Sequence, residues 1–84
     1  MYQYYILEIQ QYDSENYGHI IHFAGDADPD KAINKAYAKY YEVLSAAAVS
    51  ELPMHSAVLV QANGMPVVYK SFTHSAEPAV DSEQ

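Results

Sequence analysis

The sequence predicts an α+β domain in which a four-stranded antiparallel sheet carries one long helix on one face. Three observations support this fold class. Four short segments are rich in Tyr, Ile and Val, one longer segment repeats its apolar residues at helical spacing, and turn-forming residues separate them. The predicted order is β-β-α-β-β. At 84 residues with no cysteine, the chain needs packing or assembly for its stability.

The first two strands form a predicted hairpin. Residues 2–12 (YQYYILEIQQY) alternate Tyr5, Leu7 and Ile9 on one face with Tyr4, Ile6 and Glu8 on the other. Residues 13–16 are polar and favour a turn, and residues 19–24 (HIIHFA) form the second strand, which Gly25 ends.

The helix has the clearest start signal in the chain. Asp28 suits the N-cap and Pro29 the first helical position. The helix should end near Ser50, because Pro53 disfavours helical geometry at the residue before it. Its predicted buried stripe consists of Ile33, Tyr37, Tyr40, Leu44 and Ala47.

The second predicted hairpin pairs residues 55–62 with residues 65–72 through an Asn63-Gly64 turn. Pro66 has no N–H for a ladder hydrogen bond, so we expect the last strand to begin at an edge or a bulge. Residues 1–73 then make one domain, and residues 74–84 are expected to form a flexible acidic tail.

Apolar residues lie on both faces of the predicted sheet, and one helix is too narrow to cover even one face. We therefore expect a homodimer. Tyrosine, present nine times, is common at interfaces, although it also suits strands. The alanine-rich end of the helix allows close approach of another chain, or simply reflects helix propensity. The interface residues proposed from sequence are Tyr2, Tyr4, Ile6, Tyr41, Ala48 and Tyr69.

The charge balance excludes several classes of partner. Four lysines, no arginine and 11 acidic residues give a net charge of −7, which argues against direct nucleic-acid binding and against anionic membranes. No stretch has the pattern of a signal peptide or a membrane span. We expect a cytoplasmic protein of a bacterium or of an infected cell.

Candidate chemistry is sparse. Asp26, Asp28 and Asp30 resemble the start of a calcium loop, but the later ligand positions are wrong and a helix start explains these acids. His19 and His22 point to opposite faces of a strand and cannot share a metal ion. No phosphate-binding or nucleophile motif is present. We expect no enzymatic activity, no metal and no cofactor.

The segment 39–60 (KYYEVLSAAAVSELPMHSAVLV), followed by Asn63-Gly64, resembles small uncharacterised proteins of bacteriophages and mobile elements in Gram-positive gut bacteria. The opening YYILEIQ and the closing residues 72–74 are also similar, so the resemblance covers residues 4–74. It implies a short accessory protein of phage type and carries no known activity.

We therefore expect a non-catalytic protein-interaction module, homodimeric, that binds a host or virion protein. One alternative is a small-ligand-binding or sequestering protein with pockets at the dimer interface. Another is an acidic mimic of nucleic acid. The ridge of Lys31, Lys35 and Lys39 is either the solvated face of the helix or a binding site for an acidic partner.

Overall fold

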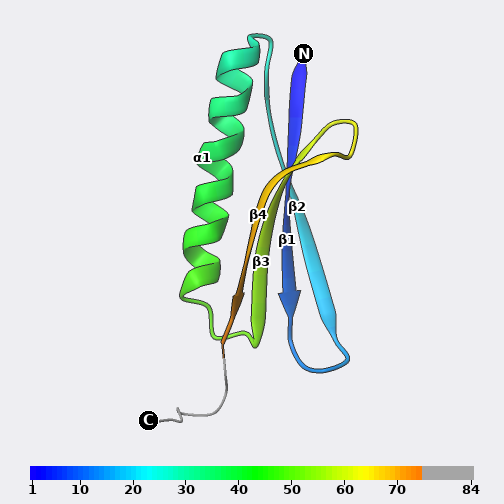
Figure 1. Ribbon diagram of the computed structural model, residues 1–84, viewed down its shortest axis with the longest axis vertical. Coiled ribbons are helices and arrows are strands. Elements are labelled where there is room, and N and C mark those ends of the chain that lie inside the picture. Colours follow the sequence, from blue (N-terminus) through cyan, green and yellow to red (C-terminus); the bar gives the residue numbers. More distant parts are fainter. Residues whose placement is uncertain (75–84) are drawn as a thin grey trace.

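The computed structural model describes residues 1–74, so the predicted tail lies, from residue 75 on, outside the described residues. Strands β1 (Tyr2–Gln11) and β2 (Tyr17–Asp26) precede helix α1 (Pro29–Ala48), and strands β3 (Met54–Gln61) and β4 (Pro66–Thr73) follow it. The predicted order and the α+β class are confirmed. Figure 1 shows α1 lying along one side of the sheet.

The sheet has the order β2-β1-β3-β4 and every neighbouring pair is antiparallel. The two hairpins therefore lie side by side, and β1 pairs with β3 to join them. Ile6 of β1 stands between His22 of β2 and Leu59 of β3. This order leaves β2 and β4 at the two edges of the sheet.

Helix α1 begins as the sequence predicts. Asp28 is the N-cap, and its side chain accepts a hydrogen bond of 2.9 Å from the backbone N–H of Asp30. The predicted buried stripe needs correction, however. The residues buried against the sheet are Ala32, Ala36, Tyr40, Val43 and Ala47. The larger side chains of Ile33, Tyr37 and Leu44 are half-buried beside this row of small residues.

The core lies between α1 and the side of the sheet that we call the inner face. Ile6 and Leu59 are its largest fully buried side chains, and they pack with Ala36, Tyr40 and Val43 of the helix. The other side of the sheet, which α1 does not touch, is called the open face. Because side chains alternate along a strand, each strand contributes every second residue to each face.

The β3–β4 turn is longer than the predicted two residues. Gly64 donates its N–H to the Gln61 carbonyl at 2.8 Å, and the Gln61 N–H donates to the Met65 carbonyl at 2.9 Å. Gly64 has φ +92°, a conformation that glycine adopts without strain. Pro66 lies at the start of edge strand β4, beside a register shift between Leu59 and Val60, as its missing N–H led us to expect.

The structure also places His74, the first residue of the predicted tail. Its backbone N–H donates to the Pro53 carbonyl at 2.8 Å. Its ring Nε2 lies 3.0 Å from the Ala47 carbonyl, and the ring stacks on Phe72. His74 thereby ties the end of β4 to the end of α1.

Candidate protein interface

The open face is an apolar surface to which all four strands contribute. In Figure 1, no other helix or strand of the described residues lies along the side of the sheet opposite α1. Strand alternation and register place the following apolar side chains on this face: Tyr5, Leu7, Ile9, Ile21, Phe23, Val58, Val60 and Tyr69.

Several of these side chains are unusually exposed for their size. Ile21 is 48% exposed, Phe23 65% and Tyr69 70%. Contiguous apolar surface of this kind on a small domain marks an interaction site more often than scattered apolar residues do. The open face is therefore the strongest candidate for a functional surface.

None of the described strands places a formally charged residue on the open face. The three charged residues within the described strands are Glu8, Asp26 and Lys70, and all three occupy inner-face positions. Within residues 1–74, the formal charges of the strands thus all lie on the inner face, in a chain whose net charge is −7. This arrangement favours an apolar, uncharged contact.

A shallow hollow of about 270 Å³ lies on the open face, lined by Tyr5, Leu7, Ile21, Phe23 and Val60. The Tyr5 and Phe23 rings meet edge to face, with centroids 5.3 Å apart and planes at 78°. Apolar hollows of this size receive large side chains of a partner at protein interfaces.

The six interface residues proposed from sequence do not form one surface. Ile6 is fully buried under α1, so it belongs to the core of the single chain. Tyr4 is half-buried and packs against the same core. Tyr41 and Ala48 are exposed on α1, and Tyr69 is the member of the set that lies on the open face.

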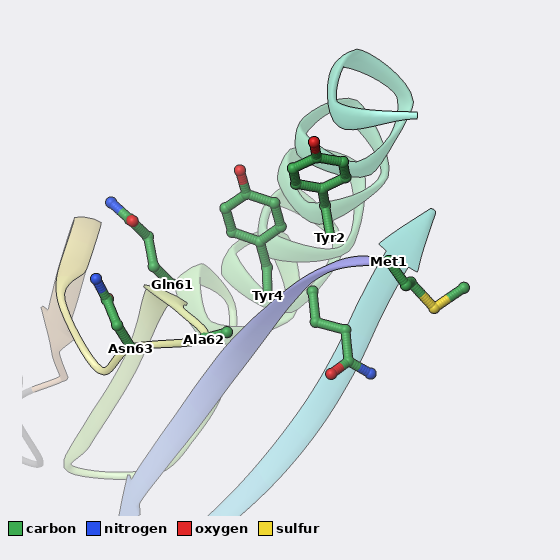
Figure 2. A pocket seen from close by; sticks show the side chains of 7 residues that line it. Met1, Tyr2, Tyr4, Gln61, Ala62 and Asn63 are labelled. Atoms are coloured by element: carbon green, nitrogen blue, oxygen red, sulfur yellow. The ribbon is translucent and has the colours of Figure 1, made fainter. Parts of the chain in front are cut away.

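Tyr2 and Tyr4 line a second hollow, of about 280 Å³, at one end of the molecule. Figure 2 shows the two rings on the same side of β1, with Gln61 and Asn63 across the hollow. Its lining is of mixed polarity, since side-chain amides and Tyr hydroxyls lie beside the apolar atoms. The sequence proposed these two tyrosines together, and the structure does bring them together.

A polar cluster that the sequence analysis missed lies on the inner face. The Glu8 carboxylate accepts hydrogen bonds from Nε2 of His22 at 2.9 Å and from Nε2 of His55 at 2.7 Å. The Glu8 and His55 side chains are 13% and 6% exposed. The available signal was Glu8, the one charged residue of its strand, next to Leu7 and Ile9, but its partners come from two other strands.

The electrostatics of Glu8 follow from these contacts. Burial alone raises the pKa of Glu8, but the hydrogen bonds from His22 and His55, with the Coulombic attraction of both rings, outweigh it and hold the pKa below the usual value. Because an ionised carboxylate only accepts, each ring must present an Nε2–H to it. Nδ1 of His55 is then buried without a hydrogen-bond partner in the described structure.

His19 lies on the open face and His22 on the inner face, which agrees with the expectation that they cannot share an ion. Among residues 1–74, no group of three or more His, Cys, Asp or Glu side chains is arranged to hold a metal ion. The cluster fixes β1 to both neighbouring strands through the hydrogen bonds of Glu8 with His22 and His55.

In the part of the chain that the structure describes, acidic residues lie at both ends of the molecule. Asp13 and Glu15 lie in the β1–β2 loop, and Asp28 and Asp30 at the start of α1, at the opposite end of the molecule (Figure 1). In the lysine ridge, Lys35 pairs with Asp26 at 2.7 Å and Lys39 with Glu42 at 2.6 Å. Two of the three ridge lysines are thus already paired within the chain.

Comparisons with known proteins give no further guide. No protein family, curated protein or solved structure was found to match this chain. Within the described part of the chain, no helix is long and apolar enough to cross a membrane.

Proposed function

We propose that this protein is a non-catalytic protein-interaction module that works as a homodimer, joined through the open faces of two sheets. The observation that carries the proposal is the apolar open face, which has no formally charged residue from the described strands and on which Ile21, Phe23 and Tyr69 remain exposed in the single chain. Burial of apolar surface contributes about 25 cal/mol per Å², so leaving this face in water is costly.

The size of the open face suits a second sheet. Four strands about 4.8 Å apart and eight to ten residues long, at about 3.3 Å per residue, give a flat area of roughly 500–600 Å². Side-chain relief raises the accessible area toward the roughly 800 Å² per partner typical of specific complexes. Two such faces pack about 10 Å apart in β-sandwiches.

A second copy fits this face better than a charged partner. The face offers no Asp, Glu or Lys from the strands for a salt bridge, so a charged protein gains nothing there. Two copies of a chain with charge −7 repel each other wherever their acids approach. A two-fold contact between open faces avoids that repulsion, because the described strands place no acidic residue there. The role in phages or mobile elements stays a prediction from the sequence resemblance.

The test is the solution mass of the full chain by light scattering, across a dilution series. Tyr69→Lys places a charge on the open face, and Tyr41→Lys places the same charge at a tyrosine of similar exposure on α1, 56% against 70%. We expect Tyr69→Lys to halve the wild-type mass and Tyr41→Lys to leave it unchanged. Leu7→Lys, in the middle of the face, should act like Tyr69→Lys.

Circular dichroism must show that each variant stays folded. The proposal fails if the wild-type chain scatters as a 9.4 kDa monomer at about 100 μM. It also fails if Tyr69→Lys and Leu7→Lys both keep the wild-type mass while folded.

A further inference from the structure

We propose that the free edge of β2 is a second self-association site, at which β2 pairs antiparallel with β2 of another copy. The proposal rests on the edge strands and not on the open face. It builds on the proposed function in one respect: with both contacts made, and with the two β2 edges of a face-paired dimer on the same side, two such dimers join into a closed assembly of four chains.

The two edges of the sheet differ in their protection. Edge strands that must stay unpaired carry prolines, bulges or lysines. Strand β4 has all three, namely Pro66, the register shift opposite Leu59 and Val60, and Lys70. Strand β2 is ten residues long and, before Asp26 at its end, contains no proline, lysine or other formally charged residue. Its register with β1 runs without a shift.

The hydrogen-bond alternation shows which backbone groups of β2 are free. The Tyr12 N–H donates to the Asn16 carbonyl at 2.9 Å, so this pair is of the hydrogen-bonded kind. In an antiparallel ladder, hydrogen-bonded and non-hydrogen-bonded pairs alternate. The next pair, Gln11 with Tyr17, is therefore non-bonded. The residues whose N–H and C=O point away from β1 are Tyr17, His19, Ile21, Phe23 and Gly25.

These free groups match those of a second β2 strand. With a two-fold axis at Ile21, each of the five outward residues faces an outward residue of the other copy: Ile21 meets Ile21, and His19 meets Phe23. About ten backbone hydrogen bonds form between the two strands, and each contributes to the stability of the contact. No Asp, Glu or Lys lies in the paired segment 17–25, so the two acidic chains meet without like charges in contact.

Self-pairing at this edge stops at two chains. The axis runs perpendicular to the sheet, so both helices lie on the same side and both open faces lie on the other. The outer edges of the joined sheet are two copies of β4, which Pro66, the bulge and Lys70 protect. The pairing is thus a closed contact and does not continue into a fibril.

The first test is amide hydrogen exchange in the wild-type chain, followed by NMR. By the same alternation, Tyr69 and Ser71 of β4 also point their N–H groups outward, and they serve as matched controls. We expect the amides of His19, Ile21 and Phe23 to be protected at least 100-fold more than those of Tyr69 and Ser71. Equal, fast exchange at both edges overturns the proposal. The same result is expected if β2 pairs only with a different protein, which is absent from the sample.

The second test uses a proline and its matched control. His19→Pro removes an outward N–H and leaves the ladder to β1 intact, whereas His19→Ala removes the side chain and keeps the N–H. We expect wild-type and His19→Ala chains to scatter as four chains, near 38 kDa, and His19→Pro as two. Should His19→Pro unfold, the exchange measurement still decides the matter.

The two proposals fail in different ways. If the edge contact is wrong, the wild-type chain is a dimer of about 19 kDa with fast-exchanging β2 edge amides, and Tyr69→Lys makes it a monomer. If the face contact is wrong, the wild-type chain is a dimer joined through the β2 edges, with protected β2 amides. Tyr69→Lys then leaves its mass unchanged, while His19→Pro makes it a monomer.

Discussion

At the scale of single residues, Glu8 makes the stability of the fold depend on pH. Its pKa in the folded chain lies below the ordinary value of 4.5, so the unfolded chain binds the proton more tightly. The stabilisation is complete above about pH 4.5 and is lost as the pH falls through the folded-state pKa. We expect Glu8→Gln to lower the free energy of unfolding at pH 7 by about 1–3 kcal/mol, because one buried imidazole N–H loses its acceptor.

Urea unfolding at several pH values, at one protein concentration, checks this prediction. The difference in unfolding free energy between wild type and Glu8→Gln should narrow below pH 4.5. Glu51→Gln, at an exposed glutamate, is the control and should leave the free energy nearly unchanged. A wild-type advantage that stays constant down to pH 2 would contradict the assigned role of the carboxylate.

The same cluster shows what a single sequence conceals. Strand alternation correctly separates His19 from His22, because it depends on one strand alone. Bringing Glu8 to His55 needs the β1–β3 register, which pairs Gln10 with His55 and Glu8 with Ala57. Two hairpins can be ordered in a sheet in several ways, and the local pattern of each hairpin does not choose among them.

At the scale of elements, the N-cap of α1 is a testable source of stability. Asp28→Ala removes the acceptor for the Asp30 N–H and should cost about 1 kcal/mol. In a domain of this size that corresponds to a fall in Tm of about 4–8 °C. Asp28→Ser retains an acceptor and should recover most of the loss in a thermal melt. Equal melting of the Ala and Ser variants would show that the cap contributes nothing.

The existence of helix α1 could be predicted from the sequence, but the residues on its buried face could be predicted only in part. Capping and periodicity correctly give a helix from Pro29, which ends at Ala48, two residues before the predicted end. The predicted stripe favoured the largest apolar residues. In the structure, Ala32, Ala36 and Ala47 form much of the buried row, because small side chains let a helix lie close to a sheet, while Ile33 and Tyr37 pack at its flanks.

The sequence predicted apolar surface left uncovered by the helix, but it did not identify the residues that form this surface. Apolar content on both faces of the strands predicted an uncovered surface, and the open face is such a surface. The residues chosen from β1, however, were Tyr2, Tyr4 and Ile6, which share the inner face with α1. Sequence alternation separates the two faces of β1 and does not say which of them the helix covers.

At the scale of the whole molecule, net charge predicts how association responds to salt. The proposed contacts contain no ion pairs, and the full chain carries −7, so long-range repulsion opposes assembly. Raising the ionic strength from about 0.01 M to 0.15 M shortens the screening length from about 30 Å to 8 Å. We expect the dissociation constant to fall several-fold over this range.

Sedimentation velocity at fixed protein concentration measures this response. Tyr41→Lys, which reduces the net charge and leaves both proposed contacts untouched, should weaken the salt dependence. Dissociation by added salt would instead point to salt bridges between the copies, and would contradict a contact made through the uncharged open face.

The central position of β1 has a consequence for how the chain folds. Each hairpin closes through a short loop, and α1 forms from neighbouring residues. The β1–β3 ladder, by contrast, joins residues on either side of the helix, from Gln11 with Met54 to Tyr4 with Gln61. When residues so distant along the chain come together, the entropy of loop closure is lost before their contacts stabilise the fold. Docking of the two hairpins should therefore set the folding rate, so that lengthening the β2–α1 connection slows folding more than it speeds unfolding.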